Sequence, residues 1–195
     1  MKKLLAILLL AALPAQGATL GAPAPDFTLQ SVAAGPVKLS QYRGKYVVLE
    51  WVNPECPYVR KHYGSANMQR LQKDTTAKGA VWLTINSTRE GHYEYKAPGE
   101  MAAWMKQMKA EPSATLLDPK SEVGRAYGAR TTPHMYIVDP KGVLVYAGGI
   151  DDKRSADPAD VKTAKNYVRA AMDELLAGKP VSSASTSPYG CSVKY

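Results

Sequence analysis

The stretch K-Y-V-V-L-E-W-V-N-P-E-C-P-Y-V-R-K-H, residues 45–62, decides how this chain folds. Its apolar part, residues 46–52, has the length and composition of a buried β-strand. Asn53 and Pro54 end that strand, and a stretch with helical spacing follows. Pro57 suits the first position of a helix, because proline lacks the backbone N–H that a helix start leaves unpaired. The sequence therefore predicts a buried strand that leads directly into a helix.

Cys56 lies at the junction between this strand and this helix. The start of a helix offers free backbone N–H groups and the positive end of the helix dipole, and both favour a thiolate over a thiol. A lone cysteine often serves only as a small buried hydrophobic residue. This one stands beside Glu55, between two prolines at the end of a strand, which is a poor place for a core residue. We therefore predict that Cys56 is a reactive nucleophile.

The motif W-V-N-P-E-C-P-Y-V around Cys56 resembles the active-site turn of the thioredoxin-like superfamily, and within it the redoxin branch of AhpC/TSA and peroxiredoxin-like proteins. Two further motifs agree with this: A-P-A-P-D-F-T-L near the start, and T-T-P-H-M-Y-I-V-D-P-K-G at residues 131–142, which resembles the cis-proline segment. The resemblance covers residues 22–176. It implies an α/β, thioredoxin-like fold with a central mixed β-sheet flanked by helices, an N-terminal β-hairpin and an extended C-terminal tail.

The resemblance also implies supporting roles for residues around Cys56. Pro133 would be a cis-proline, and the backbone of Thr132 would face Cys56 and bind an extended substrate strand, with His134 next in the chain. Glu50 matches the position of the buried acid of thioredoxin. Burial raises the pKa of such a carboxyl group, and Glu50 would accept a proton through water.

Other positions depart from the family patterns. Val59 replaces the second cysteine of thioredoxins, and Asn53 replaces the threonine of typical peroxiredoxins. The active-site arginine of peroxiredoxins has no clear counterpart, although Arg125 and Arg130 are near in sequence. His62 stands where TlpA-like proteins often have an acidic residue; it would move protons or stabilise the thiolate, or else be a plain helix-surface histidine. The sequence thus decides neither for a thioredoxin nor for a standard peroxidase.

Residues 1–17, M-K-K-L-L-A-I-L-L-L-A-A-L-P-A-Q-G, have the pattern of a secretory signal peptide: two lysines, an apolar core and a small-x-small cleavage site. The apolar run is too short to span a bilayer. We predict cleavage after Gly17, with an uncleaved anchor as the alternative, and a mature protein without a membrane span in the periplasm. The chain then divides into the signal 1–17, a thioredoxin-like redoxin domain 18–178 and a tail 179–195.

The chain is basic, with 25 Lys and Arg against 17 Asp and Glu and a formal net charge of +8. This charge could favour acidic partners or anionic membrane surfaces. The basic residues are scattered, however, and no stretch interleaves them with exposed aromatic residues. We therefore expect a solvated basic surface, no nucleic-acid site and no bound cofactor.

The second of the two cysteines, Cys191, lies in the tail. Residues 182–188 have the composition of a flexible linker, and the closing G-C-S-V-K resembles the terminal motif of a peroxiredoxin-like subgroup. A domain of this size does not need disulfide staples, so two cysteines in an oxidising compartment indicate chemistry. We predict that Cys191 is the resolving thiol, forming a Cys56–Cys191 disulfide. A static structural disulfide, or pairing in trans within a homodimer, stays open.

Two functions from different classes fit these residues. In the first, the protein is a thiol-dependent oxidoreductase. Cys56 attacks a protein disulfide or a peroxide, Cys191 resolves the mixed disulfide or sulfenic acid, and a periplasmic reductant reopens the bond. In the alternative, the protein is a Cu(I) chaperone that uses Cys56, His134 and Cys191, because soft thiolates favour Cu(I). The lack of a C-x-x-x-C pair speaks against the copper function.

Periodicity and turn residues predict the remaining elements. Strands are expected at residues 26–30, 37–40, 80–86, 115–117, 135–138 and 143–147, and helices at 57–78, 98–110, 121–127 and 157–177.

Two of these segments carry side chains of possible functional interest. Helix 98–110 places Met101, Met105 and Met108 on one face, with Trp104 on the same side, and this spacing favours core packing over copper binding. The loop 87–98 follows the carboxyl end of a strand, where α/β folds bind ligands. Its aromatic residues either border the Cys56 site or face solvent: His92, Tyr93 and Tyr95.

Overall fold

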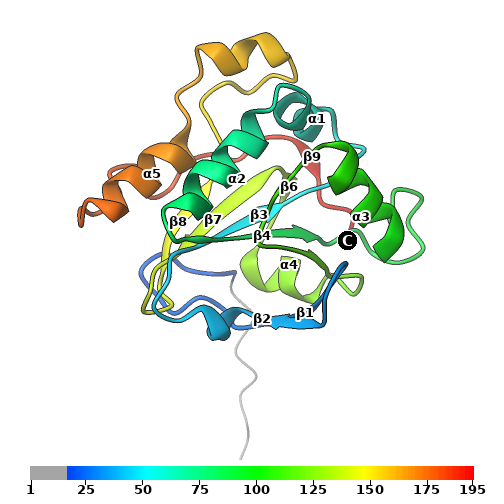
Figure 1. The fold of residues 1–195 in the computed structure, drawn as a ribbon, viewed down its shortest axis with the longest axis horizontal. Helices are drawn as coiled ribbons and strands as arrows, with labels where there is room; N and C mark the ends of the chain where they lie inside the picture. Colours follow the sequence, from blue (N-terminus) through cyan, green and yellow to red (C-terminus); the bar gives the residue numbers. More distant parts are fainter. Residues whose placement is uncertain (1–16) are drawn as a thin grey trace, which may run out of the picture.

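The computed structural model describes residues 17–195, so the predicted signal peptide, apart from Gly17, lies outside the described part of the chain. The described part contains a seven-stranded sheet in the order β2-β1-β5-β4-β3-β7-β8 (Figure 1). The strands are β1 Thr28–Ser31, β2 Pro36–Lys38, β3 Val47–Trp51, β4 Val81–Asn86, β5 Ala114–Leu117, β7 His134–Val138 and β8 Leu144–Gly148.

The sheet is mixed. Strand β3 pairs in parallel with β4 and antiparallel with β7, and β4 pairs in parallel with β5. The N-terminal hairpin β1–β2 joins the sheet through an antiparallel pairing of β1 with β5. This confirms the predicted α/β class, the central mixed sheet and the N-terminal hairpin.

Helices cover both faces of the sheet: α1 Pro57–Gly64, α2 Asn67–Ala77, α3 Pro98–Gln107, α4 Glu122–Tyr127 and α5 Tyr167–Leu176, with 3-10 helices η1 Leu39–Tyr42 and η2 Pro158–Lys162. In Figure 1, α1 and α2 lie above the strands and α4 lies below them. The alternation of side chains along β3 separates two cores. Val48 faces the core under α1, α2, α3 and α5, whereas Leu49 and Trp51 face the core over α4.

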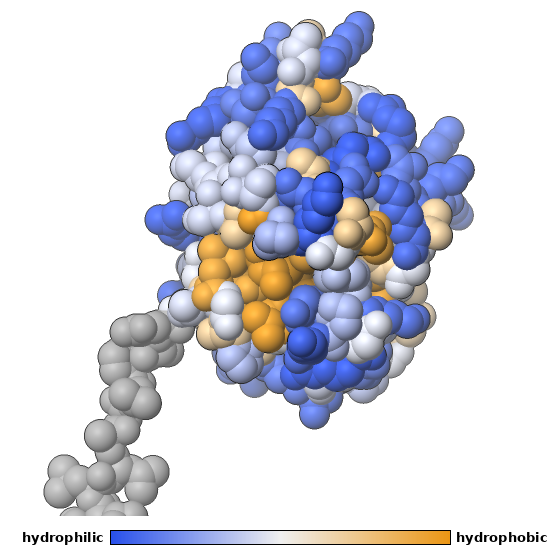
Figure 2. Space-filling model, turned by 90° about the vertical axis from the view of Figure 1, so that its left-hand side faces the viewer, coloured by the Kyte–Doolittle hydropathy of each residue, from blue (hydrophilic) through white to orange (hydrophobic). Residues whose placement is uncertain are grey.

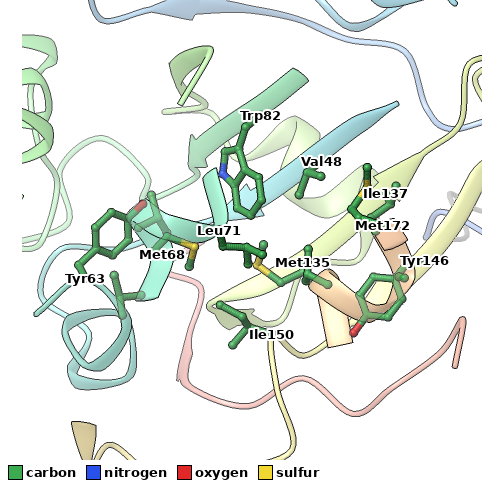
Figure 3. Packing of buried hydrophobic residues seen from close by; sticks show 14 of the residues in the cluster. Val48, Tyr63, Met68, Leu71, Trp82, Met135, Ile137, Tyr146, Ile150 and Met172 are labelled. Carbon is green, nitrogen blue, oxygen red and sulfur yellow. The ribbon is translucent and has the colours of Figure 1, made fainter. Parts of the chain in front are cut away.

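The larger core is built from close-packed apolar side chains of the sheet and the helices above it (Figure 3). Leu71 and Met68 of α2 meet Trp82 of β4 and Met135 of β7, and all four are at most 1% exposed. Burial of a side chain of the size of Leu71 stabilises the fold by about 1.5–3 kcal/mol. This core holds the end of β3 and the start of α1 in place, and Cys56 lies at its edge.

The helix predicted at residues 57–78 is divided into α1 and α2. The break lies at Ser65 and Ala66, where Ala66 has a left-handed backbone with φ 57°. Side chains pair with the backbone carbonyl groups at the end of α1: Ser65 Oγ donates to His62 O, and Gln69 Nε2 donates to Tyr63 O at 2.9 Å. The prediction of one continuous helix was wrong because these polar contacts outweigh the high helix propensity of alanine.

The helix predicted at residues 157–177 is also divided, into η2 and α5. Asn166 ends the connection and caps α5, since its side-chain Oδ1 accepts a hydrogen bond from Arg169 N at 2.9 Å. Asparagine is a preferred N-cap residue, so this boundary was readable in the sequence. The Met-rich helix behaves as predicted: Met101 and Met105 are buried in the core.

Residues 182–188 do not form the free linker that their composition predicted. They run along the edge strand β8, where Ala147 N donates to Ala184 O at 3.0 Å and Thr186 N donates to Ala147 O at 3.2 Å. The chain then reaches β9, Cys191–Ser192, which pairs antiparallel with β6, Thr131–Thr132 (Figure 1). The tail is therefore docked along its length.

The surface is hydrophilic over much of the side drawn in Figure 2. On the side drawn in Figure 2, hydrophilic side chains surround a continuous apolar area. Among the large hydrophobic residues that the structure describes, only Tyr93 and Leu176 are exposed, so this area consists of small or partly buried apolar residues. Within residues 17–195, no helix combines the length and apolar character needed to cross a membrane.

Candidate active site

Cys56 occupies the N-cap of α1, one short turn after β3, as the sequence predicted. Asn53 shapes this turn: its side-chain Oδ1 accepts from Glu55 N at 2.9 Å and its backbone oxygen accepts from Cys56 N at 3.1 Å. Pro57 is the first helical residue. The local sequence thus places the sulfur at the positive end of a helix. The side chain of Cys56 is only 2% exposed.

Thr132 and Pro133 face Cys56 across the site. The Thr132–Pro133 peptide bond is cis, as predicted. The thiol of Cys56 donates a hydrogen bond to Thr132 O at 3.0 Å. Val59, at the position of the second cysteine of thioredoxins, is fully buried in the core. Cys56 therefore has no thiol partner on its own helix.

The nearest second thiol comes from the tail. Cys191 pairs with Thr132 in the β6–β9 ladder, and its backbone N–H donates to Cys56 Sγ at an N···S distance of 3.4 Å. Both cysteines are free thiols in this structure. Burial, then the hydrogen bond with Cys56, then the charge of Cys56 raise the pKa of Cys191 to about 12. The tail strand thus lies on the edge of Thr131–Thr132, where the family resemblance predicted an extended substrate strand.

Gly190 permits this close approach of the tail. Its φ of +136° is rare for residues with a side chain, and a Cβ added there would lie 2.0 Å from Thr132 O. A glycine is therefore required for the backbone to pass so near to the cis-proline loop. The glycine of the G-C-S-V-K motif was visible in the sequence, but its contact with Thr132 was not.

The loop of residues 87–98 borders the site through residues other than those predicted. Glu94 accepts a hydrogen bond from Asn53 Nδ2 at 2.6 Å, and Arg89 N donates to Lys194 O at 2.8 Å. Tyr93 is 85% exposed and stacks on His92. Tyr93 thus faces solvent, one of the two outcomes left open by the sequence, whereas His92 and Tyr95 are half-buried. Glu94 joins the loop to the active-site turn.

Glu50 is the buried acid that the resemblance predicted. It is fully buried, and four side chains donate to its carboxyl oxygens at 2.8–3.3 Å: Tyr63, Gln72, Trp82 and Thr84. Burial raises the pKa of Glu50, and the hydrogen bonds partly oppose that rise. Glu50 lies in the same layer as Cys56 because it shares the face of β3 that carries Val48.

His62 is fully buried, so the alternative of a helix-surface histidine was wrong. Its ring nitrogens bond to Tyr189 and Asn67, at 3.2 and 2.9 Å, rather than to Cys56. Burial and the neighbouring Lys61 lower the pKa of His62 to about 3, which keeps the ring neutral. Sequence analysis missed Tyr189 and Lys61 as members of this cluster, since nothing in the sequence indicates that a lysine on α1 is buried.

His134 does not join the two cysteines. Its Nδ1 accepts a hydrogen bond from Arg130 N at 3.2 Å and lies 3.1 Å from the hydroxyl of Tyr136, on the opposite side of β7 from Met135. Among residues 17–195, no group of three or more His, Cys, Asp or Glu side chains is placed to hold a metal ion. The three ligands predicted for Cu(I) are therefore not brought together.

A cysteine at the N-cap of the helix after the central strand, opposite a cis-proline loop in a mixed sheet, defines a thioredoxin-like protein with a single cysteine in the active turn. The chain belongs to the AhpC/TSA family, whose profile matches residues 20–147. The tail motif around Cys191 lies beyond the matched residues.

Several known proteins are similar over most of the chain. Thioredoxin-like protein YneN of Bacillus subtilis is 26% identical over 148 residues, which are 72% of this chain and 79% of that protein. An uncharacterized conserved protein from Geobacillus kaustophilus superposes with a TM-score of 0.79 at 31% identity, covering 91% of this chain and 92% of the other. A candidate thiol:disulfide interchange protein, DsbE, from Chlorobium tepidum has a TM-score of 0.56 at 27% identity, covering 67% and 85%.

Proposed function

We propose that this protein is an extracytoplasmic thiol oxidoreductase in which Cys56 is the nucleophile and Cys191 of the same chain is the resolving thiol. The observation that carries this proposal is the contact between the Cys191 backbone N–H and Cys56 Sγ at 3.4 Å. This contact brings the backbone of Cys191 to the sulfur of Cys56 within one chain. The alternative in which Cys191 resolves in trans is therefore not needed.

With a disulfide as substrate, two exchange steps follow. The Cys56 thiolate attacks one sulfur of the substrate, forms a mixed disulfide and releases the other substrate sulfur as a thiolate. The Cys191 thiolate then attacks Cys56 Sγ, forms the Cys56–Cys191 disulfide and releases the second substrate thiolate. The substrate is reduced by two electrons, and a dithiol reductant restores both cysteines.

With a peroxide as substrate, the Cys56 thiolate attacks one peroxide oxygen, becomes a sulfenic acid and releases an alcohol or water. The Cys191 thiol then attacks the Cys56 sulfur, and the hydroxyl group leaves as water. The same disulfide results. Asn53 stands in place of the peroxiredoxin threonine and is occupied by Glu55 N and Glu94, which argues against a fast peroxidase.

The electrostatics of the two thiols support this order of events. While Cys56 carries a negative charge, that charge helps to keep Cys191 protonated. Once Cys56 has become a sulfenic acid or a mixed disulfide, its charge is gone and this contribution disappears. Burial, the largest cause of the raised pKa of Cys191, remains, but the loss of this charge lowers that pKa once Cys56 has reacted. In this proposal Glu50 accepts the Cys56 proton through water, as the family resemblance implies.

The extracytoplasmic location rests on two arguments. The first 17 residues have the pattern of a secretory signal peptide, which predicts a periplasmic mature protein. The second argument is the similar fold of a candidate thiol:disulfide interchange protein, DsbE, from Chlorobium tepidum, because disulfides form and persist mainly in oxidising compartments outside the cytoplasm. A lasting Cys56–Cys191 disulfide is compatible with an oxidising compartment.

The test is a mass measurement of the purified mature protein. The reduced protein is treated with one equivalent of hydrogen peroxide, or of a disulfide peptide, and its intact mass and disulfide map are recorded. The expected product has lost two hydrogens and carries a Cys56–Cys191 bond within one chain. A Cys56 that stops at sulfenic or sulfinic acid while Cys191 stays free would refute the resolving role. Comparison of the two oxidants shows which substrate class reacts faster.

A further inference from the structure

A buried polar cluster lies beside the active site and has no role in the chemistry described so far. Its members are Lys61 and His62 of α1 and Asp151 from the loop after β8, which are 1%, 0% and 2% exposed. The hydroxyl of Tyr189, itself a tail residue that is 5% exposed, enters the centre of this cluster. We name the three side chains Lys61, His62 and Asp151 the socket.

The hydrogen bonds of the socket have a fixed direction. Asn67 Nδ2 donates to His62 Nδ1 at 2.9 Å. The neutral ring therefore carries its hydrogen on Nε2 and donates it to the hydroxyl of Tyr189 at 3.2 Å. That hydroxyl in turn donates to Asp151 Oδ1. Tyr189 thus accepts hydrogen bonds from His62 and Lys61 and donates one to Asp151, and phenylalanine can do neither.

Tyr189 contacts both charged side chains of the socket, Lys61 and Asp151. Lys61 Nζ donates to Lys153 O at 2.8 Å and lies 3.9 Å from Asp151 Oδ2. It is also 3.5 Å from the hydroxyl of Tyr189 and 5.5 Å from the centre of the Tyr189 ring. Buried charges are costly unless they are paired and hydrogen-bonded. Tyr189 completes this pairing when the tail is docked.

The socket acts on Cys191 through a short connection. Only Gly190 separates Tyr189 from Cys191, and the backbone at Gly190 lies against Thr132 O. The ladder that holds Cys191 itself is only two residues long. A two-residue strand is a weak attachment by itself. Val193 and Lys194 hold the chain after Cys191 through backbone hydrogen bonds to Arg130 and Arg89, and Tyr189 is the anchor on the other side.

We propose that Tyr189 is the positioning residue of the tail, and that the socket of Lys61, His62 and Asp151 holds it so that Cys191 stays at the sulfur of Cys56. This inference rests on the proposed function, because it assigns to Tyr189 the placement of the resolving thiol. The ring of Tyr189 also packs edge-on against Tyr58 of α1, with centroids 5.8 Å apart. The docked position is therefore defined by both the ring and the hydroxyl.

The experiment compares Tyr189→Phe, Asp151→Asn and the double variant with the wild type. Tyr127→Phe is the matched control, since its buried hydroxyl donates to Pro25 O and Tyr127 lies in the core over α4, whereas Tyr189 lies in the other core. Two quantities are measured: the rate of Cys56–Cys191 closure after one equivalent of hydrogen peroxide, followed by acid quench and mass analysis, and the equilibrium of that disulfide with glutathione. Thermal unfolding is recorded in parallel.

Tyr189→Phe is expected to lower both the closure rate and the effective concentration of Cys191 roughly tenfold, because it leaves buried polar groups of the socket unpaired when the tail docks. Formation of the Cys56 sulfenic acid does not slow, because a loosened tail leaves Cys56 at least as accessible as in the wild type. Asp151→Asn produces a loss in the same direction, because its amide oxygen still accepts from Tyr189 but the negative charge beside Lys61 is gone. The double variant loses less than the sum of the two, since Tyr189→Phe alone already removes the hydrogen bond to residue 151. Tyr127→Phe closes the disulfide as the wild type does.

Three results would overturn the inference, and one of them also removes the proposed function. If the wild type forms no intrachain disulfide at all, the proposed function fails. If the wild type closes but Tyr189→Phe closes equally fast, the positioning role fails while the function stands. If the losses in closure rate of the two single variants add fully in the double variant and parallel the losses in thermal stability, Tyr189 has only a structural role. If Tyr189→Phe does not fold, Asp151→Asn provides the same comparison from the socket.

Discussion

Replacement of Gly190 by alanine is the most direct perturbation of the contact between the tail and the active site. A Cβ at this position would lie 2.0 Å from Thr132 O and 2.7 Å from Thr132 C, whereas real Cβ atoms essentially never come within 3.0 Å of a heavy atom outside their own residue and its chain neighbours. The φ of +136° is strained for alanine as well. A strained backbone of this kind costs about 1–3 kcal/mol. The tail must therefore shift or leave the Thr132 edge.

The strain shifts the equilibrium between the docked and the released tail toward the released state. A coupling of about 1–3 kcal/mol changes an equilibrium roughly 5- to 150-fold, and the clash with Thr132 O adds to it. Cys56 is 2% exposed when the tail is docked. We therefore expect Gly190→Ala to raise the rate at which Cys56 reacts with iodoacetamide, and to slow the formation of the Cys56–Cys191 disulfide by a similar factor.

The assay follows alkylation by intact mass in a Cys191→Ser background, so that Cys56 is the only thiol. The matched control is Gly35→Ala, where an added Cβ meets nothing within 4 Å and φ is not positive. The reasoning is refuted if Gly190→Ala in this background alkylates at the rate of the parent protein. The same holds if the variant closes its disulfide, with Cys191 restored, as fast as the wild type.

Three further predictions concern the second thiol, the buried acid and the helix break. Cys191→Ser should leave Cys56 as a sulfenic acid after one equivalent of peroxide, seen by mass as one added oxygen. Return of Cys56 to the reduced thiol without a second thiol would contradict this. Burial raises the pKa of Glu50, so its stabilising contribution is complete below the pKa of the unfolded state and is lost as the pH rises through the folded-state pKa. The unfolding free energy of the wild type, relative to Glu50→Gln, should thus fall by up to about 1.4 kcal/mol per pH unit above pH 4.5 in urea titrations, and a pH-independent difference would contradict it. Ala66→Gly should raise the unfolding free energy by about 0.5–1 kcal/mol because it relieves a left-handed alanine; a lower value would show that this conformation is not strained.

The strand, turn and helix around Cys56 could be predicted because their signals are local. The apolar run, the two prolines and the cysteine all lie within one stretch, and the cis-proline segment has its own motif. The break at Ala66 could not be predicted, since alanine favours helices and the contacts that cap α1 come from side chains beyond the break. The Asn166 cap was visible but was overlooked in a stretch that otherwise has helical spacing.

The placement of the tail was only partly predictable. Cys191 is identifiable as a partner because it is the second of two cysteines. Its route along β8 depends on contacts between residues 37–40 positions apart, and the burial of Tyr189 on a contact with His62, 127 positions away. No periodicity encodes either. The polar composition of residues 182–188 predicted a linker, yet these residues find backbone partners on an open strand edge, which composition does not report.

The position of the tail constrains how the proposed oxidoreductase must work. Strand β9 occupies the edge of Thr131–Thr132 and its backbone covers Cys56, so a protein disulfide and the tail cannot use this edge at the same time. A small peroxide needs less displacement than a protein substrate does. For a protein substrate, the tail must leave before Cys56 attacks, and its return brings Cys191 to the mixed disulfide while displacing the substrate strand. Resolution and product release are then one movement, and the docking strength of the tail sets the balance between access to Cys56 and completion of the reaction.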